Sequence, residues 1–585
     1  MLSVCLIWAD AALTCYILGF FLLRRGLGLI PHRQTACLFA GLVLASVYAE
    51  IFSLFAGVGL TAILLFHLLC LAAALICRKS LLSQLRSAGR FLRADRRRTA
   101  RLLLTGTLLI LLFAAGSSAG NWHIDTPLYH AQSVHWIERY GVVPGLGNLQ
   151  SHFAYNNACF SLYALFSFVW LTGQSFHAIP GFIALLVVSL CLFSPAENGE
   201  DASSHSLTRT AIRLASLLGI FFLFDELTSP SSDTCFLLLC SAVFLFWSEL
   251  SARKEASALP YVCVCMLAIF TVTVKLAAAP LVLLCIKPLV MICREEKHDR
   301  RHLLRASVLG ALAICLPFFV RGFILSGWLL YPVLPQHLID LPWQIPDGAG
   351  IYEREEIAAN GRMIFDASEI VASMSDAPLA YVIPWFRRQH RPAQLLLLVS
   401  LGALFLFLLQ LCLFLLQTGR DIVSHKKTHL RRCVLTASGD ALFMELVIAV
   451  CTVFWFFSTP QMRFGEGYLL LLCASVCGSV AEGLLRLLPA GSVSVLRKGV
   501  VPLPALFACL LLFITVRRGD LRLSHPLLQQ DYDRYPTAVY SIGDFSFYYP
   551  TDFVYTGYYD FPATRWQATD VVPLGDDIRD GFGMR

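Results

Sequence analysis

Charged residues are scarce in this sequence, where Asp, Glu, Lys and Arg make up only 15% of 585 residues. Because soluble domains carry about 25% charged residues, this composition excludes an ordinary soluble protein. Hydrophobic residues make up 57%, and uncharged apolar runs of about 18 to 24 residues recur along the chain, long enough for helices that cross a bilayer. A transmembrane β-barrel would instead alternate over strands of about ten residues. The sequence therefore predicts a polytopic α-helical membrane protein.

Zinc-binding and disulfide patterns are also missing. The chain has 20 cysteines, but no Cys-x-x-Cys pair is accompanied by a second pair or by histidines at zinc spacing. Most cysteines lie inside the apolar runs, where a thiol packs as a small hydrophobic group. The first apolar run, residues 2–23, lacks a basic leader and a small-residue cleavage site. We expect this run to stay in the protein as a helix and not to be removed as a signal peptide.

Basic residues gather in short segments between the apolar runs. Residues 78–101 carry nine basic residues and a single acidic residue, Asp95, and residues 287–305, 420–432 and 497–498 are basic as well. Short loops with this bias stay in the cytoplasm, which predicts both chain ends on the outer face. The same bias accounts for the net charge of +7, so we expect no nucleic-acid partner.

With these constraints, the apolar runs predict an all-α fold of about 14 transmembrane helices. Segment 157–172 is not counted as a crossing. Residues 120–155 are predicted on the outer face, and the next helix, 176–194, must also start there. We predict a juxtamembrane or interfacial helix at 157–172; the alternative is that it crosses and another run does not. The predicted crossings are 3–23, 36–56, 59–77, 102–119, 176–194, 210–225, 235–250, 258–274, 276–293, 303–320, 393–416, 440–457, 467–485 and 499–516.

The last region of the chain differs from the rest, because it is polar and rich in tyrosine. Alternation in Phe545-Ser-Phe-Tyr-Tyr549 predicts short strands or extended structure. We expect this tail to be ordered and to lie on the membrane domain. The predicted regions are 1–101 (three helices and a basic loop), 102–320 (a core with an outer loop at 120–175), 321–391 (a long outer loop), 392–517 (C-terminal helices) and 518–585 (the outer tail).

The densest group of polar side chains directly follows the predicted helix 102–119. We predict that Asp125 is the catalytic base, since a general base needs neighbours that hold it beside a substrate hydroxyl or amine. Two alternatives stay open: a solvated aspartate at a helix end, and a metal site shared with histidines. His130 and His135 are five residues apart, whereas helical metal ligands align at i,i+4. The polar neighbours of Asp125 are Asn121, His123, Tyr129, His130, Gln132 and His135.

Three other predicted outer helix ends each carry one cation, namely Lys275, Arg321 and Arg463. A phosphate leaving group needs such cations, because negative charge builds on it as the bond breaks; the alternative is that these side chains reach the lipid headgroups. Asp233, in the turn Ser229-Pro-Ser-Ser-Asp233, is a second outer carboxylate or else a helix N-cap. The predicted substrate-binding residues are His123, Tyr129, His130, His135, Asp233, Lys275, Arg321 and Arg463.

These elements resemble the GT-C superfamily of integral membrane glycosyltransferases, the group of the aminoarabinose transferases and protein mannosyltransferases. The resemblance covers about residues 102–320 and consists of Asp125 in the first large outer loop, the short helix after it, the Ser229–Asp233 turn and Lys275. It implies a GT-C-like fold, a polyprenyl- or dolichyl-linked sugar donor and, in some members, a divalent metal such as Mg or Mn. Three helices precede the loop in addition to the family pattern, and no Asp-x-Asp or Asp-Glu pair stands beside Asp125, which argues against a resident metal.

A second resemblance is to a poorly characterised family of bacterial envelope membrane proteins, and it spans most of the chain. It implies a relationship to the GT-C fold but gives no substrate. The stretches that carry it are Asp125-x-Pro-Leu-Tyr-His130, Tyr140–Leu149, Tyr155-Asn-Asn157 and Pro460-x-x-Arg463-Phe464.

Together, these observations predict a glycosyltransferase of the bacterial inner membrane that acts on its outer face in envelope glycan or polysaccharide synthesis or modification. Its partners would be a polyprenyl-phosphate-linked sugar, membrane lipid, and a glycan, lipid or protein acceptor. Two other classes stay open. A transporter or flippase of lipid-linked glycan would place ionisable groups at mid-membrane, where Asp10 and Glu50 are the main candidates. A non-catalytic assembly protein would not need Asp125.

Overall fold

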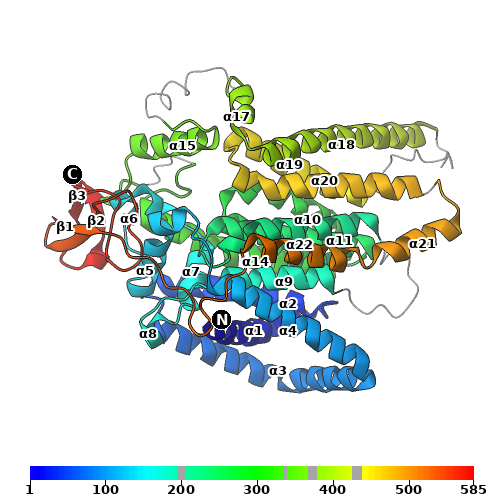
Figure 1. The fold of residues 1–585 in the computed structure, drawn as a ribbon, viewed down its shortest axis with the longest axis horizontal. Coiled ribbons are helices and arrows are strands. Elements are labelled where there is room, and N and C mark those ends of the chain that lie inside the picture. The colour runs from blue at the N-terminus through cyan, green and yellow to red at the C-terminus, as the bar shows by residue number, and fades with distance from the viewer. Residues whose placement is uncertain (194–205, 334–338, 366–378, 425–437, 486) are drawn as a thin grey trace.

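Long helices run side by side along one direction of the molecule (Figure 1). The computed structural model describes residues 1–193, 206–333, 339–365, 379–424, 438–485 and 487–585. Within them, eleven helices are long and apolar enough to cross a membrane: α1 with η1 (Leu2–Gly26), α2 (Thr35–Ser53), α3 (Leu60–Ala94), α4 (Arg96–Ser118), α10 with η5 (Leu207–Glu226), α11 (Ser232–Ala252), η6 with α13 (Leu276–Arg294), α14 (Lys297–Ser326), α18 (Arg391–Ser424), α19 (Gly439–Ser458) and α20 (Met462–Leu485). The protein is therefore a multi-pass helical membrane protein.

Three of the predicted crossings form shorter helices. These are α9 (Ile179–Leu192), α12 (Ala258–Val274) and α22 (Leu503–Arg518). Helix α12 ends because Lys275 is extended, with φ −154°, and the chain continues as the 3-10 helix η6 (Leu276–Cys285), which contains Pro280. Proline cannot donate a backbone hydrogen bond, so it disfavours a regular α-helix at this point. The predicted total of about 14 crossings stays a prediction.

The sequence predicted a loop at the basic segment 78–101, but the structure shows helix there. Helix α3 continues to Ala94, and α4 begins at Arg96. The run of apolar residues ends at this segment, but the helix continues because Leu, Arg, Lys and Gln are good helix formers. The break comes at Asp95, whose side chain accepts a hydrogen bond from the Arg98 amide at 3.0 Å and caps α4. In Figure 1 this turn lies at the same end of the bundle as α21 (Ala490–Val500).

Segment 157–172 forms two short helices, α7 (Ala158–Leu165) and α8 (Val169–Thr172), separated at Phe168. At 1.5 Å per residue, eight residues cover only about 12 Å, far less than a hydrocarbon core. Every residue of α7 is buried, and the helix packs against α2 and α5 (Ala131–Arg139). The segment is short, as predicted, and α7 is enclosed by protein whereas α8 has no buried residue; its juxtamembrane position stays a prediction.

The predicted outer loop 321–391 contains helices. Helix α14 continues to Ser326 and ends at Gly327, whose φ is +74°. Helices α15 (Asp347–Gly361) and α17 (Val382–Arg388) follow; residues 334–338 and 366–378 of this predicted loop lie outside the described residues.

The C-terminal region forms strands, as predicted. Strands β1 (Thr537–Ile542) and β2 (Phe545–Pro550) pair antiparallel, and β3 (Val571–Pro573) pairs with β4 (Phe582–Met584). This tail is bonded to the helices: the Gln530 amide donates to the Ser118 carbonyl at 2.7 Å, and the Leu2 amide donates to the Pro526 carbonyl at 3.0 Å. Both chain ends and the short helices α5 to α8 therefore lie at the end of the bundle opposite α21 (Figure 1).

Candidate functional site

The segment after α4 is fixed to the turn before α11. The Asn121 amide donates to the Asp225 carbonyl at 2.8 Å, and the His123 amide donates to the Ser229 hydroxyl at 2.7 Å. A Cβ atom on Gly120 would overlap the Asp225 carbonyl oxygen, so only glycine permits this close approach. The sequence thus aligns the stretch that carries Asp125 with the serine-rich turn that carries Asp233.

Asp125 immediately precedes a π-helical turn, η2 (Thr126–His130). Such turns are rare and often found at functional sites. The Asp125 amide donates to Nδ1 of His123 at 3.2 Å, and its side chain is mostly buried, with 16% exposed. The turn therefore directs the carboxylate toward helices that come from distant parts of the chain.

Asp233 lies in the first turn of α11 and does not cap it, contrary to one of the two readings of the sequence. The N-cap is Ser231, whose hydroxyl accepts the Asp233 amide at 3.2 Å. A carboxylate at this position is stabilised by the helix dipole. Its side chain is only 6% exposed, and one of its oxygens, Oδ1, accepts a hydrogen bond from Lys275.

Lys275 reaches this carboxylate from the break between α12 and η6. Its ammonium group also lies 3.2 Å from the centre of the Phe464 ring, a cation–π arrangement. Burial lowers the pKa of Lys275 to about 8, although the charge of Asp233 opposes the shift. This lysine is thus a cation held in a protein environment and does not extend to the lipid headgroups.

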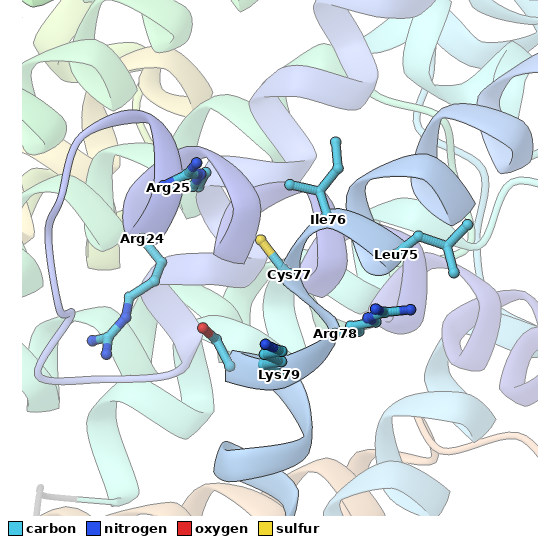
Figure 2. Close-up of a pocket in the computed structure, with 8 residues that line it drawn as sticks. Arg24, Arg25, Leu75, Ile76, Cys77, Arg78 and Lys79 are labelled. Atoms are coloured by element: carbon cyan, nitrogen blue, oxygen red, sulfur yellow. The ribbon is translucent and has the colours of Figure 1, made fainter.

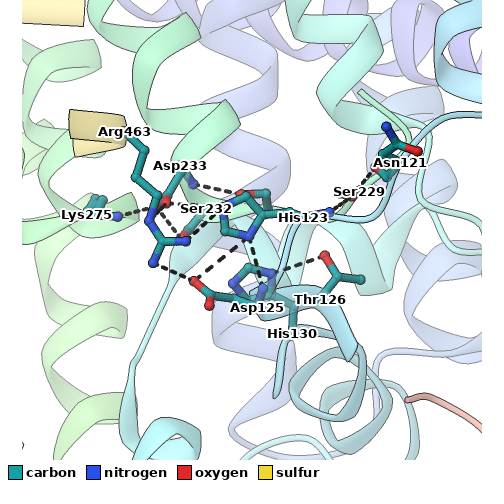
Figure 3. A network of polar contacts seen from close by, with 11 residues as sticks. Asn121, His123, Asp125, Thr126, His130, Ser229, Ser232, Asp233, Lys275 and Arg463 are labelled. Atoms are coloured by element: carbon teal, nitrogen blue, oxygen red, sulfur yellow. Dashed lines mark hydrogen bonds and ion pairs between the residues drawn. The ribbon is translucent and has the colours of Figure 1, made fainter. Parts of the chain in front are cut away.

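Arg463, near the start of α20, joins the two carboxylates (Figure 3). Its guanidinium lies 3.0 Å from Asp125 and 3.2 Å from Asp233. It also lies 3.2 Å from Nε2 of His123, which is 3.5 Å from Asp233. We call the group His123, Asp125, Asp233, Lys275 and Arg463 the charged cluster; it draws side chains from four separate segments.

The neighbours of His123 shift its pKa upward. Burial opposes protonation, but the hydrogen bond to Asp233 and the charges of Asp233 and Asp125 outweigh burial and raise the pKa of His123. Buried charges are tolerated only when they are paired and hydrogen-bonded. The alternation of cations and carboxylates satisfies this condition.

His123, Asp125 and Asp233 also fit as ligands of a metal ion. Each offers one ligand atom, and these atoms lie within 4.8 Å of one another. Oxygen Oδ2 of Asp233 is buried and lies 3.2 Å from Arg463 and 3.5 Å from His123, so a bound ion would have to share it with these neighbours. Mg²⁺ and Mn²⁺ prefer oxygen ligands, so the donor set of two carboxylates and one imidazole suits either ion.

Two further predicted residues lie beside the charged cluster. The ring of His130 is centred 5.7 Å from that of His123, and the ring of Tyr129 is 4.4 Å from His130. Burial, and the nearby charge of His123, lower the pKa of His130 well below its usual value. His130 is therefore a neutral neighbour of the charged cluster, and Tyr129 packs edge-on against its ring.

The structure does not bring His135 and Arg321 to the charged cluster. The His135 ring stacks on Tyr558 and Phe561, with centroids 4.2 and 3.8 Å away, so it fastens the tail to α5. Arg321 bonds to Asn156 at 3.2 Å and to Ser53. In the sequence, His135 resembled the other predicted site histidines and Arg321 resembled the other outer cations. Their partners in the fold hold both side chains away from the charged cluster.

Sequence reasoning missed two contributors. Ser229 accepts the His123 amide, and Phe464 forms the ring under Lys275. Their position next to predicted site residues was the available signal, because Ser229 opens the serine-rich turn and Phe464 follows Arg463.

These observations define a multi-pass helical membrane protein with a buried charged cluster at one end of its bundle. A family model described as a domain of unknown function (DUF8201) matches residues 1–470, so the chain belongs to this family. All members of the charged cluster lie within the matched residues. The comparison with curated protein sequences gives no match.

Proposed function

We propose that this protein is a GT-C-type glycosyltransferase that takes its sugar from a polyprenyl-phosphate donor. The observation that carries this proposal is that Arg463 contacts both Asp125 and Asp233, and that Lys275 contacts Asp233. One site then offers a proton acceptor and two phosphate-binding cations. The same cations beside Asp233 place a second carboxylate within the site.

In the proposed reaction, Asp125 takes the proton of the acceptor hydroxyl or amine as that group attacks the anomeric carbon. The bond between the anomeric carbon and the phosphate oxygen breaks, and its electron pair leaves with the polyprenyl phosphate. Lys275 and Arg463 bind the negative charge that develops on the phosphate. Arg463 supplies a planar fork and Lys275 a point charge, two complementary ways to bind phosphate.

The charge of the cluster suits this ligand. Lys275 and Arg463 are two cations beside the two carboxylates, and protonation of His123 would add a third. A sugar linked through a phosphodiester to a polyprenol carries one negative charge. The raised pKa of His123 thus favours the state that binds such a donor.

The proposed location is the bacterial inner membrane, with the charged cluster and both chain ends on the outer face. The distribution of basic residues supports this orientation, because the basic turn between α3 and α4 lies at the opposite end of the bundle (Figure 1). Short basic segments stay in the cytoplasm. The acceptor would then be an envelope glycan, lipid or protein.

A divalent metal would replace the proton on His123 in this scheme, because an imidazole binds a metal only in its neutral form. His123, Asp125 and Asp233 would hold it, and it would supply charge for the leaving phosphate. Titration of Mn²⁺ into the purified protein, followed by electron paramagnetic resonance, tests the fit: Asp233→Asn should abolish saturable binding. Binding that survives in Asp233→Asn would contradict this ligand set.

Activity is tested with the purified full-length protein and a panel of polyprenyl-phosphate sugars, by release of free polyprenyl phosphate. Asp125→Asn should lower the rate by at least about 100-fold, as loss of a general base does. The matched control is Asp552→Asn, since Asp552 is an exposed tail carboxylate and should keep full activity. Release at the wild-type rate by Asp125→Asn would reject the assignment.

A transporter or flippase is the second candidate, favoured by two buried glutamates within candidate spans. Both carboxylate oxygens of Glu50 and of Glu445 are buried without hydrogen-bond partners among the described residues. Intramembrane carboxylates often mark ion pathways. Loss of lipid-linked glycan movement in a Glu50→Gln/Glu445→Gln variant, with no sugar release by the wild type, would favour this class.

A further inference from the structure

A basic hollow lies between the ends of α1 with η1 and the middle of α3 (Figure 2). It is an open hollow of about 530 Å³, lined by Arg24, Arg25, Arg78 and Lys79 together with Leu75, Ile76, Cys77 and Ser80. No ion pair neutralises any of these four cations within the part of the chain that the structure describes. The hollow therefore concentrates unpaired positive charge and has the volume of a small-ligand pocket.

The hollow lies at the depth of a lipid headgroup layer. Helix α3 starts at Leu60, and Arg78 is about 27 Å further along at 1.5 Å per residue. Helix α1 starts at Leu2, and Arg24 is about 33 Å further along by the same rise. Two neighbouring helices thus each cross about one hydrocarbon thickness, about 30 Å, before presenting a pair of cations.

Apolar side chains continue from the hollow toward the hydrocarbon. Leu75 and Ile76, one turn before Arg78 and Lys79 on α3, are 58% and 61% exposed. An acyl chain would cover them while its headgroup phosphate meets the cations. A water-soluble anion would use the cations alone and leave these two side chains uncovered.

The backbone brings the arginines into this position by a π-helical turn. Residues Phe21–Gly26 form η1, which ends α1 and carries Arg24 and Arg25. Arg24 and Arg25 come from η1 and Lys79 and Arg78 from α3, with Cys77 between the two elements (Figure 2). Such turns often occur at functional sites.

We propose that this hollow binds the phosphate of an anionic phospholipid headgroup, with the acyl chain along Leu75 and Ile76. Guanidinium groups bind phosphate oxygens in a bidentate manner, and an ammonium adds a point charge. Basic pockets between membrane helices recognise anionic headgroups in this way. The proposal is independent of the charged cluster, which lies at the other end of the bundle.

The test measures phosphatidylglycerol binding by the full-length protein in dodecylmaltoside micelles, by native mass spectrometry. Replacing Arg24, Arg25, Arg78 and Lys79 by Gln should weaken binding at least tenfold, at about fivefold per surface cation. The matched control replaces Arg90, Arg93, Arg96 and Arg97, which are exposed on the α3–α4 turn, and should change binding less than twofold. Equal losses, or no loss, would overturn the proposal.

A second comparison separates a lipid from a free anion. Phosphatidylcholine with the same acyl chains should bind at least tenfold more weakly than phosphatidylglycerol, and glycerophosphoglycerol, the headgroup alone, should not compete at millimolar concentration. Leu75→Ser/Ile76→Ser should weaken phosphatidylglycerol binding while the variant keeps its melting temperature. Full competition by inorganic phosphate, or unchanged binding by Leu75→Ser/Ile76→Ser, would assign the hollow to a soluble anion.

Discussion

The guanidinium of Arg463 lies 3.0 Å from the carboxylate of Asp125, although the two residues belong to opposite halves of the chain. This pair closes the charged cluster, because the same guanidinium lies 3.2 Å from Asp233. The long-range pairing makes the site dependent on the docking of α20 beside the segment after α4.

Removal of Lys275 should destabilise the protein as well as inactivate it. Lys275→Met leaves Asp233, whose side chain is 6% exposed, without its ammonium partner, and breaking a buried pair costs about 3 kcal/mol or more. The double variant Lys275→Met/Asp233→Asn should recover most of the stability and none of the activity. Thermal unfolding in detergent measures the first effect; equal melting temperatures of wild type and Lys275→Met would contradict it.

Donor binding should weaken as the pH rises above about 8. A lysine is cationic below its pKa, and the pKa of Lys275 is lowered to about 8, so its charge is lost as the pH passes that value. Affinity for polyprenyl phosphate, measured between pH 6 and 9.5, should fall through this range. In Lys275→Arg the fall should move to a higher pH; an identical profile would exclude Lys275 as the titrating group.

Gly120→Ala should disturb the site without removing any of its charges. The added methyl group would overlap the Asp225 carbonyl oxygen, so the segment after α4 must move away from the turn that carries Asp233. Displacement of a positioning element costs about 100-fold in rate. The control is Gly106→Ala, since a Cβ there meets no atom within 4 Å; comparable activity of the two variants would contradict the prediction.

Tyr558→Phe should loosen the tail. The Tyr558 hydroxyl donates to Glu138 at 2.6 Å, and a buried carboxylate that loses such a partner costs about 1–3 kcal/mol. Limited proteolysis should cleave the region 519–585 faster than in the wild type. Tyr549→Phe is the control, because the Tyr549 hydroxyl makes no hydrogen bond within the described ranges, and it should be cleaved at the wild-type rate.

Much of the fold could be predicted because lipid imposes simple rules. Long apolar runs predicted the long helices, and the alternation at Phe545–Tyr549 predicted β2. The helix over residues 78–94 could not be predicted from hydropathy. Outside the membrane a helix no longer needs apolar side chains, although its backbone stays helical. Helix α12 (Ala258–Val274) has the bounds that its apolar run predicted, but the ion pair of Lys275 with Asp233 just after it was not predictable from the run.

The residues of the site could be predicted from the sequence, but the ion pairs and hydrogen bonds between them could not. Asp125, Asp233, Lys275 and Arg463 stood out as polar groups at helix ends, but the pairings that join them depend on tertiary packing. Arg321 looked equivalent to Arg463 in sequence, and only the packing shows that it bonds to Ser53 and Asn156. Contacts with residues far away in the sequence decide which arginine joins the charged cluster, and these contacts cannot be read from a single sequence.

The bond between the Leu2 amide and the Pro526 carbonyl bears on biosynthesis. Ribosomes synthesise the chain from its N-terminus, so more than 500 residues must follow α1 before Leu2 gains this partner. The Met1 ammonium likewise donates to the His525 carbonyl at 2.7 Å. The contacts that join α1 to the tail at this end of the bundle therefore form only after residues 525 and 526 have been synthesised.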